Sequence, residues 1–101
     1  MSVRLAVDRC FVVVAFDVRD DRRRSRLGRY LLRHGTRVQL SVFECLVRHH
    51  RLDAFVQDLT RFLEPGVDRL TVYPLCHPCQ DGVHRRGAPL GALPEREAFI
   101  I

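Results

Sequence analysis

An unbroken run of seven apolar residues, CFVVVAF at positions 10–16, constrains the fold more than any other stretch of this sequence. A short run rich in Val and Phe is typical of a strand that is buried on both faces. The run ends on the carboxylate of Asp17. Because the polar end of a buried strand can present a charged group to a ligand, Asp17 is the first candidate functional residue.

The residues that follow predict a helix and then extended structure. The aspartate pair at 20–21 can cap a helix that runs to His34. Gly35 would provide the C-terminal stop of that helix. Alternating hydrophobicity at 36–46 predicts a strand. Since this segment is long for one strand, we expect it to bend near Ser41 or to divide into two there.

The second half of the chain is expected to contain another helix followed by another strand. Apolar residues at helical spacing predict a helix at 51–63, which Pro65-Gly66 would end. The strand expected next covers 68–75, and a short strand is expected around Val83. The chain ends in four apolar residues, Ala98–Ile101, which would be an aggregation hazard as a free edge. We expect them to pair with a sheet edge in a symmetric dimer.

This element order predicts a single α+β domain over residues 1–101, with its core at about 10–80. The strand, helix, strands, helix, strand order is the split βαβ pattern of the ferredoxin-like sandwich, an antiparallel sheet with two helices on one face. The other sheet face would then need cover, which again favours a homodimer. Residues 81–101 would pack on the domain or exchange a C-terminal strand across the dimer.

The charge of the chain points to nucleic acid as a partner. All 17 Lys and Arg residues are arginines, and the formal net charge is +5. Guanidinium groups bind phosphate oxygens in a planar, bidentate way, and a small basic domain with clustered arginines is typical of nucleic-acid binding. No stretch approaches the roughly 18 apolar residues of a membrane span. Without a signal-peptide core, the predicted location is the cytoplasm.

The arginines are densest at the start of the first predicted helix. They form a basic stripe that either contacts phosphates or is an ordinary solvated helix face. The positions expected to contact nucleic acid there are Arg22, Arg23, Arg24 and Arg26.

Three motifs in order resemble those of the family of the small CRISPR-associated protein numbered two. They are FVVVAFDVRDDRRRSRL, which contains the Asp17 carboxylate and the basic run to Arg26, then HGTRVQLSVFEC, then DRLTVYPLC. The resemblance covers roughly residues 10–80. Members work beside the CRISPR integrase in acquiring new spacers.

The resemblance implies a ferredoxin-like homodimer whose C-terminal strands reach across to the partner. It also implies a divalent metal, Mg²⁺ or alternatively Mn²⁺, held between two copies of Asp17. On the residues alone, a turn-forming carboxylate between strand and helix is the favoured interpretation of Asp17, whereas the resemblance favours the metal role. Phe16 stands where the family commonly has tyrosine, so a role that needs a hydroxyl is not expected. The other positions that match the family are Arg24, Arg26, Arg37 and Phe43. The resemblance implies that Arg37, like the arginines of the first helix, binds nucleic acid.

Other side chains have weaker claims to a chemical role. Ser41 and Phe43 are expected to support the site, Phe43 by packing. No His or Asp lies at a sequence spacing from Ser41 that would indicate a nucleophilic catalytic pair. The pair Cys76 and Cys79 forms a lone CxxC, whereas a structural zinc generally needs four ligands. His84 could be a third ligand, but we expect reduced thiols in a loop.

Two functions from different classes remain open. In one, the protein is a metal-dependent endonuclease that cleaves phosphodiester bonds of RNA or DNA at paired Asp17 carboxylates. In the other, it is a non-catalytic adaptor whose dimer bridges integrase subunits and supports duplex DNA. A stand-alone, toxin-like ribonuclease of the same fold is a third alternative.

Overall fold

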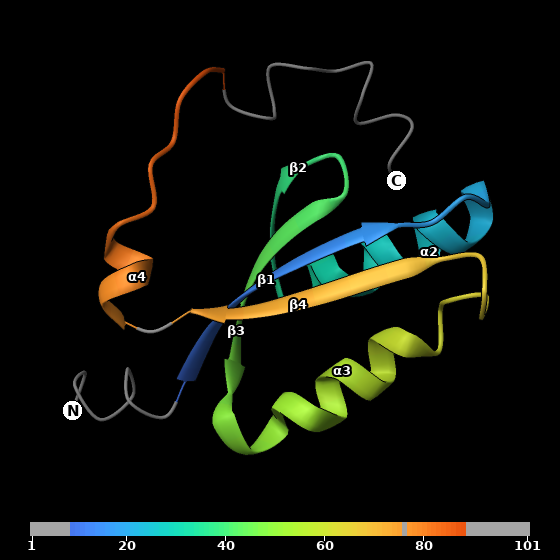
Figure 1. The fold of residues 1–101 in the computed structure, drawn as a ribbon, viewed down its shortest axis with the longest axis horizontal. Helices are drawn as coiled ribbons and strands as arrows, with labels where there is room; N and C mark the ends of the chain where they lie inside the picture. The colour runs from blue at the N-terminus through green and yellow to red at the C-terminus, as the bar shows by residue number, and fades with distance from the viewer. Residues whose placement is uncertain (1–8, 76, 89–101) are drawn as a thin grey trace.

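The computed structural model describes residues 9–75 and 77–88. The sheet is four-stranded and antiparallel throughout, in the order β2-β3-β1-β4 (Figure 1). This order, with one helix after β1 and another after β3, is that of the ferredoxin-like split βαβ fold, so the predicted α+β class is confirmed. The elements in chain order are β1 (Arg9–Asp17), α2 (Asp21–Leu32), β2 (Gly35–Gln39), β3 (Val42–Arg48), a 3₁₀ turn (His49–Arg51), α3 (Leu52–Thr60), β4 (Arg69–Leu75) and α4 (His77–Asp81).

The central strand β1 is buried on one face only. Val12 and Val14 are completely buried, whereas Val13 and Ala15, which point the other way, remain partly exposed. The prediction of burial on both faces is therefore wrong. The reason is that α2 and α3 cover the same face of the sheet, where their side chains join the core formed by β1 and β3. The helix residues in this core are Leu27, Leu31, Phe55 and Leu59.

The opposite side of the sheet, called the open face below, carries Phe11, Val13, Ala15 and Asp17 of β1 and the residues that pair with them. Because directly opposed residues of antiparallel strands share a face, these partners belong to the open face as well. They are Val42, Glu44 and Leu46 of β3, and Arg69, Thr71, Tyr73 and Leu75 of β4.

The segment predicted as one bent strand or two is two strands. β2 and β3 form a hairpin whose turn lies at residues 40–41, with an irregularity in pairing between Arg37 and Gln39. Gly35 is the first residue of β2, not the helix stop that was predicted. A Cβ there would lie 2.1 Å from the Glu44 carbonyl oxygen, so this position needs glycine for close strand approach.

The predicted helix ends extend slightly too far. The N–H groups of Arg33 and His34 donate to the carbonyls of Tyr30 and Leu31 at 3.1 and 2.9 Å, which tightens the end of α2 into a turn before Gly35. Likewise, α3 is bounded by the 3₁₀ turn before it and by turns after Thr60.

The region after β4 differs most from expectation. Residues 77–81 form the short helix α4 in place of a loop, and Val83 is not in a strand. Residues 83–88, called the strap below, lead away from α4 without pairing to a strand (Figure 1). The prediction for 98–101 lies outside the described residues. No helix in the described part of the chain is long and apolar enough to cross a membrane.

Candidate functional site

The candidate carboxylate, Asp17, is the last residue of β1 and is exposed. It lies on the open face, directly opposite Arg69 of β4, which is exposed as well. Cβ atoms of directly opposed residues are typically about 5 Å apart. Asp17 and Arg69 are therefore neighbours of opposite charge at one end of the open face, on the side of the sheet that the helices do not cover.

The β2–β3 hairpin fixes the end of β1 just before Asp17. The N–H of Phe16 donates to the Ser41 carbonyl at 3.0 Å, so the hairpin turn is tied to the strand end. On the covered face, the rings of Phe16 and Phe43 stack with centroids 6.0 Å apart. Phe43 is completely buried, so its supporting role is packing rather than contact with a base. Phe16, at the position where the family commonly has tyrosine, is part of the same apolar layer.

The helix α2 begins at a well-formed cap. The Asp20 side chain accepts a hydrogen bond from the N–H of Arg23 at 3.0 Å. This bond lowers the pKa of the Asp20 carboxyl. Asp21 lies in the first turn, where its negative charge interacts favourably with the helix dipole. The predicted capping role is therefore confirmed for Asp20, whereas Asp21 is the first residue of the helix itself.

Two of the arginines predicted to bind nucleic acid instead form hydrogen bonds and ion pairs with groups of the protein itself. The Arg23 guanidinium donates to both carboxylate oxygens of Asp68, Nε to Oδ2 at 2.8 Å and Nη2 to Oδ1 at 3.2 Å. Arg24 donates to the Val18 carbonyl at 3.0 Å and pairs with Asp21. Both arginines lie on the sides of α2 that flank the buried Leu27, which is why they turn inward.

Asp68 organises the junction between α2 and the segment that leads into β4. Besides Arg23, it accepts the N–H of Arg19 at 3.3 Å and that of Glu64 at 2.8 Å, and its side chain is completely inaccessible. The Arg23 hydrogen bond, more than any other contact, lowers the pKa of Asp68 to about 2. Asp68 therefore stays charged and ties the start of α2 to the segment that leads into β4.

The remaining predicted arginines of α2 face solvent. Arg22 and Arg26 are one helical turn apart and exposed. They line a shallow depression together with Asp21, Ser25 and Arg29. The exposed face of α2 is therefore a basic surface, called the α2 basic stripe below, made of Arg22, Arg26, Arg29 and Arg33.

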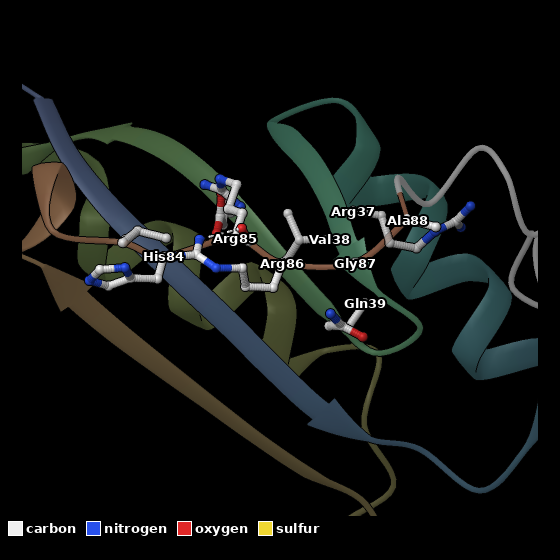
Figure 2. A pocket seen from close by; sticks show the side chains of 10 residues that line it. Arg37, Val38, Gln39, His84, Arg85, Arg86, Gly87 and Ala88 are labelled. Carbon is white, nitrogen blue, oxygen red and sulfur yellow. Dashed lines mark hydrogen bonds and ion pairs between the residues drawn. The ribbon is translucent and has the colours of Figure 1, made fainter.

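Arg37 is on a different element, the edge strand β2. It lines a cavity of about 700 Å³ between β2 and the strap, together with Arg85 and Arg86. Arg85 forms an ion pair with Glu44 of the open face, Nη2 to Oε1 at 2.5 Å. Figure 2 shows the strap passing in front of the sheet, with Arg37 beside Ala88 at one end of it. The structure therefore does not bring Arg37 into the α2 basic stripe.

The described residues of one chain do not form a metal site by themselves. Among the described residues, no three His, Cys, Asp or Glu side chains gather closely enough to hold a metal ion. Burial, reinforced by the charge of Glu44, raises the pKa of the Cys45 thiol to about 11, which makes it an unsuitable ligand. Cys79 is exposed in α4, and Cys76 lies outside the described residues, so zinc at the CxxC pair stays a prediction.

Several residues near the site could not be identified by sequence reasoning. Asp68 and Arg69 stand between a turn and a strand, where charged residues are ordinary, and only the long-range pairing of β1 with β4 brings them to Asp17. The Glu44–Arg85 ion pair joins residues 41 positions apart. No local pattern in the sequence signals such a contact.

The fold and this arrangement define a small α+β protein with a carboxylate at a strand end and a basic helix next to it. A family model described as CRISPR-associated protein Cas2 matches residues 10–83. The chain belongs to this CRISPR-associated family.

Named relatives and solved structures agree with that membership. The chain is 36% identical over 92 residues to CRISPR-associated endoribonuclease Cas2 4 of Rhodospirillum rubrum, covering 88% of this chain and 71% of the relative. It is 44% identical over 62 residues to CRISPR-associated endonuclease Cas2 2 of Thermus thermophilus, covering 61% and 69%.

Two crystal structures share the fold. Hypothetical protein TT1823 from Thermus thermophilus superposes with a TM-score of 0.69 at 36% identity, covering 80% of this chain and 94% of that one. Streptococcus pyogenes Cas2 superposes with a TM-score of 0.67 at 28% identity, covering 76% and 99%. The resemblance stated from the sequence motifs is thus confirmed.

Proposed function

We propose that the protein is a CRISPR adaptation subunit that binds nucleic acid as a homodimer, works beside the CRISPR integrase in the cytoplasm and cleaves phosphodiester bonds. The observation that carries this proposal is the exposed Asp17 carboxylate at the polar end of β1. Relatives named endoribonuclease and endonuclease support a hydrolytic role for such a group.

The proposed site holds Mg²⁺, or Mn²⁺ in its place, between Asp17 and the same residue of a second copy. Mg²⁺ takes six oxygen ligands but keeps several waters, so two carboxylates at a two-fold axis are a sufficient protein contribution. Such an ion, when bound, lowers the pKa of a coordinated water and neutralises charge on a phosphate. Arg69, directly across from Asp17, offers a cation to the phosphate oxygens.

The open face supports the proposed dimer. Leu46 and Tyr73 lie on it and are 51% and 54% exposed, next to the partly exposed Phe11 and Val13 of β1. An apolar sheet face of this kind is an interaction surface in soluble proteins. Since Asp17 lies on the same face, a second copy docked there would bring a second Asp17 near the first.

The α2 basic stripe supports nucleic-acid binding by the same dimer. Its exposed arginines contact phosphates without reading the sequence, which suits DNA or RNA of arbitrary sequence. Arg23 and Arg24 would act indirectly, by fixing the start of the helix through Asp68 and Asp21.

The direct experiment compares cleavage by the wild type and by Asp17→Asn on single-stranded RNA and duplex DNA. Each protein is assayed with Mg²⁺, with Mn²⁺ and with EDTA, after its oligomeric state has been measured. We expect metal-dependent cleavage by the wild type and its loss in the variant. Asp53→Asn is the matched control, since Asp53 is an exposed carboxylate on α3, and this variant should cleave like the wild type.

The adaptor alternative makes a different prediction for the same assay. Its basic stripe needs no carboxylate chemistry, so both proteins would bind nucleic acid equally, with salt-sensitive affinity and no cleavage. That result would reject the nuclease proposal and return Asp17 to a turn-forming role. RNA cleavage that stays the same when the integrase is added to the assay would instead favour the stand-alone ribonuclease.

A further inference from the structure

The cavity between β2 and the strap carries more positive than negative charge. Three of its lining side chains are arginines, Arg37, Arg85 and Arg86, and Glu44 is the carboxylate among its described lining residues. Arg85 is matched by Glu44 through their ion pair. Arg86 donates only to the carbonyl of Arg85, at 2.8 Å, which leaves its charge without a counter-ion among the described residues.

Arg37 contributes the feature that points to a ligand. Its Nε and Nη1 atoms are buried, and none of the described residues accepts a hydrogen bond from them. A guanidinium is permanently charged, and buried polar groups in native proteins nearly always have a partner. An anion in the cavity would provide the acceptor that these two donors lack.

The volume of the cavity and its other lining residues indicate how large this anion is and what else it carries. The volume of about 700 Å³ is within the usual range for a small-molecule site and larger than phosphate alone requires. Val38, Val83 and His84 supply apolar and ring surface beside the arginines. Figure 2 shows Arg86 directed back toward His84, at the opposite end of the strap from Arg37.

We propose that this cavity binds a phosphorylated ligand of mononucleotide size, with its phosphate on Arg37 and its base between the strap and β2. The phosphate could belong to a free nucleotide or to the terminal nucleotide of a nucleic acid. Because the ligand contacts both β2 and the strap, its binding holds the strap against the sheet. This proposal does not depend on cleavage at Asp17.

Titration calorimetry on the full chain tests the proposal with defined probes. We expect AMP to bind and adenosine, which lacks the phosphate, not to bind. Arg37→Gln should weaken AMP binding about tenfold or more, because a charge-assisted hydrogen bond is removed. Arg86→Gln should weaken it less, and it provides a second test if Arg37→Gln fails to fold. The matched control is Arg61→Gln, whose side chain is 80% exposed on the helical side.

An oligonucleotide with and without a 5′ phosphate distinguishes the two sources of the ligand. Binding of AMP shows that a free nucleotide suffices, whereas Arg37-dependent binding of only the phosphorylated oligonucleotide assigns the cavity to a nucleic-acid end. Asp17→Asn should bind AMP like the wild type, which separates this site from the cleavage site. Equal binding by Arg37→Gln and Arg61→Gln, or no binding of any phosphorylated probe, would overturn the proposal.

Discussion

At the scale of single residues, the contacts of Asp68 couple the stability of the fold to pH. Its carboxylate accepts hydrogen bonds from the Arg23 guanidinium and from two backbone N–H groups. These contacts lower its pKa from 3.8 to about 2. Because the folded state holds the charged form, the stabilisation is complete above the unfolded pKa and is lost as pH falls through the folded one.

The prediction is a loss of stability between about pH 4 and pH 2 that depends on Asp68. Urea unfolding of the wild type across this interval should show a falling free energy of unfolding. Asp68→Asn should be less stable than the wild type at neutral pH and should show a flatter acid limb. Asp53→Asn is the comparison, and an acid limb unchanged by Asp68→Asn would show that another carboxylate is responsible.

The sequence was sufficient to single out Asp17 but not the residues around it. Asp17 ends a long apolar run, which is a local signal, and it does lie exposed at the end of β1. The roles of Arg23 and Arg24 could not be read in the same way. Four arginines at 22, 23, 24 and 26 look alike in the sequence. Only the helix phase relative to Leu27 decides which of them bond to groups of the protein and which face solvent.

At the scale of elements, α2 serves two purposes on opposite sides. Leu27 and Leu31 pack into the core, and Arg22 and Arg26 face solvent on the other side. In the proposed function, the solvent-facing side holds a phosphate backbone while the other side keeps its place in the core. The energetic signature of phosphate binding is salt dependence, since each neutralised phosphate releases condensed counter-ions.

The double variant Arg22→Gln/Arg26→Gln tests this surface. If both side chains bind phosphate, the slope of log affinity against log salt for duplex DNA should become shallower by about 0.9 for each arginine that is replaced. Arg51→Gln/Arg61→Gln removes the same charge from exposed positions around α3. A slope that changes equally in both variants would indicate general electrostatics and no specific role for α2.

The order and type of the elements followed from local patterns, and their boundaries followed less well. Alternating hydrophobicity predicted the main strands, and apolar residues at helical spacing predicted the two longer helices. Gly35 was misassigned because a glycine after a helix usually signals a left-handed cap, whereas this one is required by its approach to Glu44 across the hairpin. The strap was missed as well, because its position depends on the long-range Arg85–Glu44 pair.

At the scale of the whole molecule, the sheet has two unlike faces. Two helices cover one face, and the other presents Leu46, Tyr73 and the Asp17 carboxylate. The proposed dimer would cover the apolar part of the open face and complete the metal site in the same step. Metal binding and dimerisation are then linked, so that a divalent ion should stabilise the dimer and the dimer should raise metal affinity.

The number of Mn²⁺ ions bound per dimer tests most directly the proposed metal site between two copies of Asp17. Mn²⁺ can be counted by its electron paramagnetic resonance signal, which distinguishes free from bound ion, in parallel with sedimentation analysis of the oligomeric state. The account predicts a single tightly bound ion per dimer in the wild type and in Asp53→Asn, and none in Asp17→Asn. Equal Mn²⁺ binding by Asp17→Asn, or a full site in each separate chain, would contradict it.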